Sequence, residues 1–373
     1  MSQESQGHEP LWDDLNAVLD NQERATEELA ALDHQLAQHP DDTLMRRKKG
    51  YLQATLHRYE DALRTYEHAL SLDAADAWTW MSYANMLDKL QRDDEALAAY
   101  RRATQLAPHF AAAWVNWSVA LNRLHRDTEA LEATEQAICV APDVATAWNA
   151  KGVALLGLDR PHAAFTAWRR AVTLNPDFVA AWFNIAEAYR ASHRHQQALN
   201  TYARVLSLDQ QFAPAWLGRA ETFTALKRFP EALSAFERVF QFEQGSARAW
   251  QGKGIALQGL GREDEALTAF ERALATGDSD AALWNDKGSA LLRLGRAGDA
   301  LEAYKHVVDI APDNWYSWRG IATTLKSLGR DEEALDAARH ELSLRIAQSR
   351  FPLRSIIARL IYHNASAMKA TTD

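Results

Sequence analysis

The sequence predicts an all-α fold in which antiparallel helix pairs stack one behind another as a solenoid. Three observations carry this prediction. Apolar residues follow a helical spacing of three and four rather than the alternation of a strand. Alanine returns in a constant register from Ala62 through Ala266 to Ala334. Tryptophan returns every 34 residues without insertion or deletion, as Trp80, Trp114, Trp148, Trp182, Trp216, Trp250, Trp284 and Trp318. A fixed period of this kind indicates repeats that bury their apolar faces against their neighbours.

Composition narrows the class of protein. A chain of 373 residues could form several globular domains, but a repeat array uses that length as one continuous domain. The single cysteine, Cys139, excludes an intramolecular disulfide, and its apolar surroundings predict a buried, inert thiol. No secretion signal and no run of about 18 apolar residues is present, so we expect a cytoplasmic protein without a membrane span.

The net negative charge is concentrated in the N-terminal segment. Residues 1–42 carry eleven acidic side chains and one basic side chain, within a total net charge of −9. The remaining chain is therefore close to neutral, which disfavours general binding to nucleic acid because phosphates require a basic face.

The N-terminal segment precedes the regular repeats. We expect residues 1–10 to be a disordered acidic tail and residues 11–42 to be a degenerate helix pair that caps the array, with helices at roughly 11–21 and 23–38. The acidic segment also suggests a hypothesis, in which it occupies a basic surface of the repeats and competes with ligand.

Nine repeats of 34 residues are predicted over 43–348, each with two helices of about 14 residues. They begin at Thr43, Ala77, Ala111, Ala145, Val179, Ala213, Ala247, Ala281 and Trp315. In the repeat at Ala247 the residues expected to be buried are Trp250, Gly254, Leu257, Ala266, Leu267, Phe270, Ala273 and Leu274. Small residues at Gly254 and Ala266 let the two helices approach closely, while Gly261 and Arg262 set the turn between them.

The C-terminal segment 349–373 is predicted to be an amphipathic capping helix with a tail. The ninth repeat lacks its closing proline, so its second helix should continue to about Gln348 before Pro352. In the following segment Leu353, Ile356 and Leu360 share one helix face. Such a helix can cover the end of the stack, bind a partner or lie on an acidic membrane, and we favour the first of these.

The repeats resemble the tetratricopeptide repeat family. Its pattern of tryptophan, small residue, leucine or tyrosine, alanine, aromatic, alanine and proline is matched by Trp80, Ala84, Leu87, Ala96, Tyr100, Ala103 and Pro108. The match is repeated by Trp148, Gly152, Leu155, Ala164, Trp168, Ala171 and Pro176. The resemblance implies a right-handed superhelix whose first helices line a concave groove, with ligand contacts from their second, fifth, sixth, ninth, twelfth and thirteenth residues.

Candidate partner-binding residues follow from those positions. They are Arg47, Lys48, Tyr51, Asn85, Lys89, Asn116, Arg123, Asn149, Phe183, Asn184, Arg190, Arg248, Asn285, Arg293 and Arg319. With Lys326, the groove positions hold nine basic residues against four acidic ones, Asp88, Glu187, Glu221 and Asp286. This excess predicts an acidic peptide as ligand. The asparagines add a means of bonding to a peptide backbone regardless of its side chains.

No pattern in the sequence indicates catalysis. The pair His193 and His195 lacks further ligands at metal-binding spacing, and no phosphate loop or nucleophile motif occurs. We therefore expect a non-enzymatic interaction scaffold that binds extended segments of partner proteins, with no cofactor and no metal. The alternatives are a regulatory or targeting subunit of an enzyme complex, an enzyme resembling the helical subunits of prenyltransferases, and a helical-repeat reader of RNA. The sequence does not indicate the oligomeric state.

Overall fold

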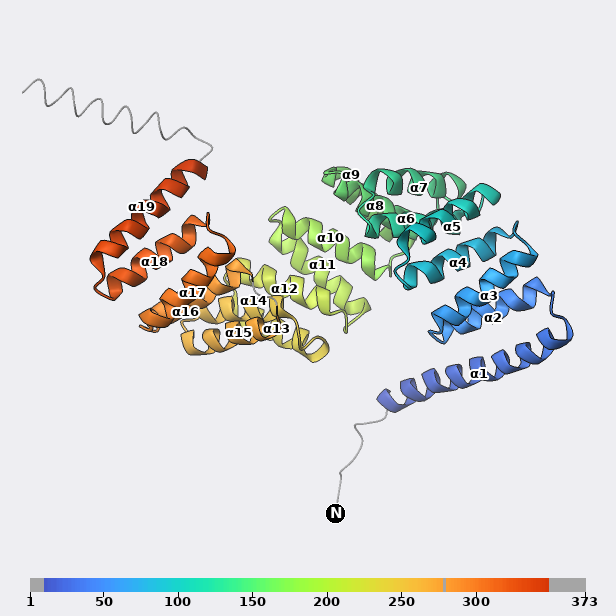
Figure 1. The fold of residues 1–373 in the computed structure, drawn as a ribbon, viewed down its shortest axis with the longest axis horizontal. Helices are drawn as coiled ribbons and strands as arrows, with labels where there is room; N and C mark the ends of the chain where they lie inside the picture. The colour runs from blue at the N-terminus through green and yellow to red at the C-terminus, as the bar shows by residue number, and fades with distance from the viewer. Residues whose placement is uncertain (1–9, 278–279, 349–373) are drawn as a thin grey trace, which may run out of the picture. The chain divides into compact units, whose positions relative to one another are not determined.

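The computed structural model describes residues 10–277 and 280–348, with side chains from residue 24 onward. Within this part of the chain all regular secondary structure is helical, with nineteen helices and no strand (Figure 1). The first helix, α1, spans Pro10–Gln38. The other eighteen form nine pairs.

The first helices of the pairs begin at the predicted residues. They are α2 (Thr43–Thr55), α4 (Ala77–Lys89), α6 (Ala111–Arg123), α8 (Ala145–Gly157), α10 (Val179–Ala191), α12 (Ala213–Ala225), α14 (Ala247–Gly259), α16 (Ala281–Arg293) and α18 (Trp315–Ser327). The second helices are α3 (Tyr59–Leu72), α5 (Asp93–Leu106), α7 (Asp127–Val140), α9 (Pro161–Leu174), α11 (His195–Leu208), α13 (Phe229–Phe242), α15 (Glu263–Ala275), α17 (Ala297–Ile310) and α19 (Asp331–Gln348). The predicted helix starts and the extension of the last helix to Gln348 are therefore confirmed.

The chain divides into two compact units, Met1–Ala188 (unit 1) and Tyr189–Asp373 (unit 2), with the boundary inside α10. The sequence predicted a single continuous domain, and we describe each unit by itself. Within a unit each first helix packs against the second helix of its pair, and that second helix packs against the next first helix. Consecutive first helices also contact one another, as α4 and α6 do in unit 1 and α12 and α14 do in unit 2. The first helices thus form an inner layer and the second helices an outer layer.

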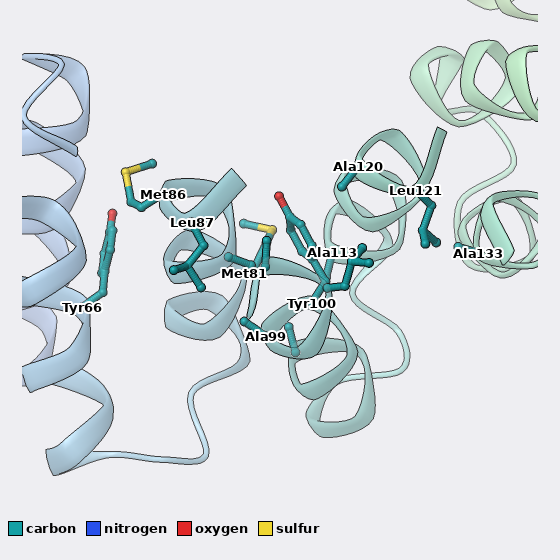
Figure 2. Close-up of a cluster of buried hydrophobic side chains, with 14 of the residues drawn as sticks. Tyr66, Met81, Met86, Leu87, Ala99, Tyr100, Ala113, Ala120, Leu121 and Ala133 are labelled. Atoms are coloured by element: carbon teal, nitrogen blue, oxygen red, sulfur yellow. The ribbon is translucent and has the colours of Figure 1, made fainter. Parts of the chain in front are cut away.

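In several pairs a small residue of the first helix faces a large ring of the second, whereas the third and ninth pairs carry Thr134 and Ala338 at the ring position. A Cβ added at Gly152 would lie 2.2 Å from the indole nitrogen of Trp168, and one added at Gly254 would lie 2.4 Å from the Phe270 ring. Trp168 and Phe270 are almost completely buried. In unit 1 one apolar cluster runs from the first repeat into the fourth, and Figure 2 shows part of it between consecutive helices. Because each repeat completes the core of the next, the array buries apolar area without a closed globular centre.

The recurring tryptophans are only partly buried, which corrects the expectation for Trp250. Leu274 is also partly exposed, whereas the other six predicted core residues of that repeat are buried. Seven of these eight indoles each donate a hydrogen bond to a backbone carbonyl in the loop before their repeat. The Nε1 atom of Trp80 donates to the carbonyl of Ala74 at 3.0 Å, and Trp114 donates to Pro108 at 2.9 Å.

The turn between the helices of a pair contains one residue in the left-handed region. Glycine occupies this place at Gly261, Gly295 and Gly329, each with φ of +73°. In the other six repeats a residue with a side chain adopts the same conformation, namely His57, Gln91, His125, Asp159, His193 and Lys227. Every turn between paired helices therefore has the left-handed backbone conformation of Gly261, although only a third of the turns have glycine there.

The N-terminal helix pair predicted for 11–42 is wrong, because α1 is one continuous helix. No glycine or proline interrupts residues 11–38, so nothing in the sequence ends a helix near residue 22. The C-terminal half of α1 buries Leu29 and Leu32 against Leu52. It also places Glu28 and Asp33 in ion pairs with Lys48 and Lys49.

Three further predictions concern the two termini of the chain and the thiol of Cys139. The predicted acidic tail and the predicted C-terminal capping helix lie outside the described residues, apart from Pro10. Cys139 is exposed, which corrects the predicted burial of its thiol. Among the described residues, no helix has the length and hydropathy needed to cross a bilayer.

Candidate functional site

The candidate residues lie on the first helices, at the positions that we call the inner face: the second, fifth, sixth, ninth, twelfth and thirteenth residue of each. The structure does not gather them into one basic surface. In unit 1 the asparagines form hydrogen-bonded pairs, and in unit 2 most of the arginines form ion pairs.

Asn85 and Asn116 form the first amide pair of unit 1. Nδ2 of Asn116 donates to Oδ1 of Asn85 at 3.1 Å, and the hydroxyl of Tyr100 donates to the same oxygen at 2.6 Å. Burial raises the pKa of Tyr100, so its hydroxyl stays protonated as a donor. Both lone pairs of the Asn85 oxygen are thus engaged, and the orientation of its amide is fixed.

Asn149 and Asn184 form the second amide pair. Nδ2 of Asn184 donates to Oδ1 of Asn149 at 2.9 Å, across 35 residues of sequence. The backbone carbonyl of Asn149 accepts a bond from the indole of Trp168 at 3.2 Å, which anchors this turn of α8 to α9.

Each amide pair leaves one donor and one acceptor without a bond to the described residues. In the first pair these are Nδ2 of Asn85 and Oδ1 of Asn116, and in the second they are Nδ2 of Asn149 and Oδ1 of Asn184. A peptide unit presents the complementary carbonyl and N–H groups. The pairs can therefore bond to an extended backbone of any sequence, with their rotamers already fixed.

Exposed apolar side chains also occupy inner-face positions of unit 1. Tyr51, a predicted candidate, is 58% exposed, and Val119 and Leu156 are 53% and 52% exposed. Val119 and Leu156 were not among the predicted candidates, because the prediction was restricted to polar and aromatic residues at the inner-face positions. The sequence could have identified both residues, because they occupy the ninth and twelfth positions of their helices, where no core residue is expected.

The basic residues of unit 1 are largely paired. Arg47 bonds Asp76 at 3.2 Å and stacks over Trp78, and Lys48 pairs with Glu28 of α1. Arg123 bridges Asp88 at 2.7 Å and Asp93 at 2.5 Å. Lys89 is exposed and makes no ion pair with the described residues.

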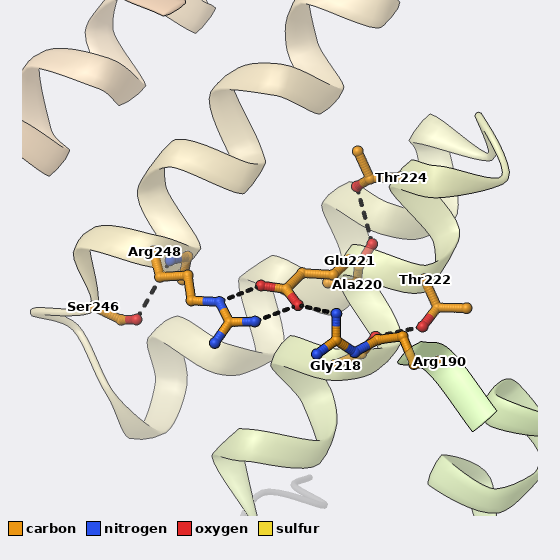
Figure 3. Close-up of polar contacts among 9 residues, drawn as sticks. Arg190, Gly218, Ala220, Glu221, Thr222, Thr224, Ser246 and Arg248 are labelled. Atoms are coloured by element: carbon orange, nitrogen blue, oxygen red, sulfur yellow. Dashed lines mark hydrogen bonds and ion pairs between the residues drawn. The ribbon is translucent and has the colours of Figure 1, made fainter. Parts of the chain in front are cut away.

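An arginine pair sharing one carboxylate dominates the inner face at the start of unit 2 (Figure 3). Glu221 accepts two bonds from Arg248, at 2.5 and 2.8 Å, and lies 3.4 Å from the guanidinium of Arg190. Both arginines were predicted to meet an acidic ligand. Here both guanidinium groups already have a carboxylate partner, Glu221, within the protein.

A partly buried carboxylate, Asp286, lies on the inner face of the eighth repeat. Asp286 accepts a bond from Nε2 of Gln251 at 2.8 Å, and its burial raises its pKa. The neighbouring candidate Asn285 has its Oδ1 atom buried without a partner. Arg293 pairs with Glu263 at 3.0 Å. This stretch therefore offers hydrogen-bond acceptors to a ligand.

The last repeat carries cations without a carboxylate partner. Arg319 is exposed and lies 4.6 Å from the centre of the Tyr316 ring, which is itself 51% exposed. Neither Arg319 nor Lys326 makes an ion pair with the described residues. Phe183, the remaining candidate, is partly buried on α10.

Six of the nine predicted basic residues thus form ion pairs within the protein. Several of their partners, including Asp76, Asp93 and Glu263, stand outside the positions that the charge count covered. The net charge of +5 predicted for the groove is therefore offset locally. No cluster of three potential metal ligands occurs among the described residues.

Comparison with known proteins agrees with this geometry. A tetratricopeptide repeat model matches residues 47–109, 149–211, 183–247 and 252–315, which together make up more than half of the chain. A search of curated proteins returned no significant match.

Two solved structures resemble the fold at low identity. A chain from the APC/C hetero-tetramer Cut9-Hcn1 has a TM-score of 0.54 at 16% identity, covering 81% of this chain and 73% of that one. A tetratricopeptide repeat protein from Parabacteroides merdae has a TM-score of 0.51 at 14% identity, covering 67% of this chain and 98% of that one. Together with the repeat matches, these observations show that the chain belongs to the tetratricopeptide repeat family.

Proposed function

We propose that this protein is a scaffold for protein–protein interactions that holds an extended segment of its partner against the inner face of unit 1. The tetratricopeptide repeats and the similarity to solved repeat proteins support a protein-binding scaffold. The repeat fold is generally a non-catalytic frame, so we assign a binding role rather than a reaction.

The amide pairs are the observation that carries the proposal. Asn85 with Asn116, and Asn149 with Asn184, each present a fixed donor and a fixed acceptor. Fixed groups lose little side-chain entropy when a ligand binds, which favours affinity. Val119 and Leu156 supply apolar contact for side chains on the same segment.

Charge contributes to the proposed choice of partner. We propose that acidic side chains of the segment meet Lys89, which has no carboxylate partner among the described residues. The net charge of −9 favours a protein partner over a nucleic acid, and we propose a cytoplasmic location. Rim charges act mainly on the rate of association, so binding should weaken as the salt concentration rises.

The experiment is a pull-down from native lysate with the intact protein beside an Asn116→Ala, Asn184→Ala double variant. The matched control is an Asn200→Ala, Gln105→Ala double variant, which removes two amides from second helices. We expect the first variant to lose partners that the control retains. Retention of every partner by the first variant would reject the inner face of unit 1 as the binding surface.

A further inference from the structure

A pocket lies away from the inner face, between α5, α6 and α7 of unit 1. Its volume is about 480 Å³, and its lining includes Arg101, Trp114, Trp117, Glu129, Glu132 and Glu135. Most of these residues belong to second helices, so the pocket opens through the outer layer. The binding role proposed above does not use it.

The pocket lies where a contact that joins some of the neighbouring repeats is absent. In four other repeats the seventh residue of the first helix bonds a carboxylate sixteen residues earlier on the preceding helix. Lys49 bonds Asp33 at 2.5 Å, Tyr83 bonds Glu67 at 3.1 Å, Lys151 bonds Glu135 at 3.0 Å and Lys287 bonds Glu271 at 3.5 Å. In the third repeat the two positions hold Trp117 and Arg101, which cannot form this bond.

Trp117 has a buried donor without an acceptor. Its ring stacks on Trp114 with centroids 5.5 Å apart and planes inclined by 29°. The Nε1 atom of Trp114 donates to a backbone carbonyl, whereas Nε1 of Trp117 is buried and bonds no described atom. A buried donor without an acceptor destabilises the folded protein, so a ligand that supplies a carbonyl there is favoured.

Among the charged residues that line the pocket, one carboxylate, Glu132, and one cation, Arg101, make no ion pair with the described residues. Glu129 accepts two bonds of 2.7 Å from Arg126, and Glu135 bonds Lys151. The hydrogen bond from Arg126 lowers the pKa of Glu129, and the charge of Arg101 acts in the same direction. Glu132 is exposed and has no ion pair with the described residues.

We propose that this pocket binds an arginine side chain of a partner protein. The guanidinium lies against the indoles of Trp114 and Trp117 and pairs with Glu132, while a backbone carbonyl beside that arginine accepts the bond from Nε1 of Trp117. Arginine suits this site better than lysine because its planar, weakly hydrated cation stacks on aromatic rings and pairs with carboxylates.

The test follows the indole Nε1–H resonances of the full-length ¹⁵N-labelled protein, with that of Trp117 assigned from Trp117→Phe. The probe is N-acetyl-arginine amide, and its neutral isostere N-acetyl-citrulline amide is the control ligand. We expect a saturable shift of the Trp117 resonance with the arginine probe and a clearly weaker one with citrulline. No shift with the arginine probe, or equal shifts with both probes, would overturn the proposal.

Two variants separate the role of Glu132 from a general loss of surface charge. Glu132→Gln should weaken binding of the arginine probe about fivefold, as expected for loss of an exposed ion pair. Glu302→Gln is the matched control, because Glu302 is exposed at the same register position of the eighth repeat. Equal affinities of the two variants would contradict the assigned role of Glu132.

Discussion

The inner faces of units 1 and 2 use the same helix positions for different chemistry. In unit 1, Oδ1 of Asn149 accepts a hydrogen bond from Nδ2 of Asn184. Nδ2 of Asn149 and Oδ1 of Asn184 make no bond to the described residues. In unit 2 the same two positions, again 35 residues apart, hold Gln251 and Asp286, and here the first residue donates to the second. The repeat frame decides which side chains meet, and the identity of two residues decides what the pair offers to a ligand.

Ion pairs join neighbouring first helices in both units, as Arg123 and Asp88 do in unit 1, whereas among the described residues amide pairs between first helices occur in unit 1. Unit 1 has two amide pairs between consecutive repeats, whereas the first ion pairs of unit 2 join Arg190 and Arg248 through Glu221. Both sets link neighbouring first helices. We infer that unit 1 is suited to backbone contacts and unit 2 to charged side chains.

The largest effect should come from the cores, where the two units are expected to agree. Trp168→Ala in unit 1 and Phe270→Ala in unit 2 each remove an almost fully buried ring that faces a glycine. Each should lower the free energy of unfolding by about 3–5 kcal/mol, measured by urea denaturation.

The exposed ring of Tyr51 provides the control for this comparison. Tyr51→Ala should change the free energy of unfolding by less than about 0.5 kcal/mol. If one core variant unfolded like the control while the other did not, the two units would not share one packing scheme.

A smaller effect should distinguish the inner faces by pH. Burial raises the pKa of Asp286 above the ordinary value of 3.8, so ionisation of this carboxyl destabilises the folded protein above its folded-state pKa. Asp286→Asn should therefore be more stable than the natural protein at pH 7. That advantage should shrink as the pH falls through the folded-state pKa of Asp286 towards 3.8.

The measurement is thermal unfolding of both proteins between pH 4 and pH 7, with the exposed Asp309→Asn as the matched variant. An Asp286→Asn protein less stable than the natural one at pH 7 would show that the carboxylate stabilises unit 2 through the bond from Gln251.

The smallest effect concerns the turns, which also differ between the units. All four left-handed turn residues of unit 1 carry side chains, as at His125, whereas unit 2 has glycine at Gly295 and two other turns. Gly295→Ala should lower the free energy of unfolding by about 1 kcal/mol, and His125→Gly should raise it by up to about 1 kcal/mol. Chemical denaturation of both variants checks the pair, and a destabilised His125→Gly would mean that its side chain contributes more than its backbone costs.

Much of the fold could be predicted from the sequence, because an unbroken 34-residue period fixes the start of every repeat. Thr43 and Trp315 begin the first and last pairs as expected. The single helix α1 was missed because a weak apolar pattern was divided without a helix breaker. The partial exposure of Trp250 was missed because hydrophobic character alone does not show which side of a ring the neighbouring repeat covers.

The candidate site was less predictable. The asparagine positions were found by register, but their pairing depends on distances between repeats that a sequence does not contain. The ion pairs were missed for a similar reason, since Asp76 and Glu263 reach the inner face from helix ends. Charge counts over helix positions overlook such partners.

The most direct test of the proposed function places a photo-crosslinking amino acid at Val119 on the inner face of unit 1, and separately at Gln105 on a second helix. Cells expressing each protein are irradiated, and the crosslinked products are identified by mass spectrometry. We expect partner crosslinks from position 119 that disappear when Asn116→Ala and Asn184→Ala are added. Crosslinks from position 105 alone, or crosslinks from position 119 that persist without both asparagines, would contradict it.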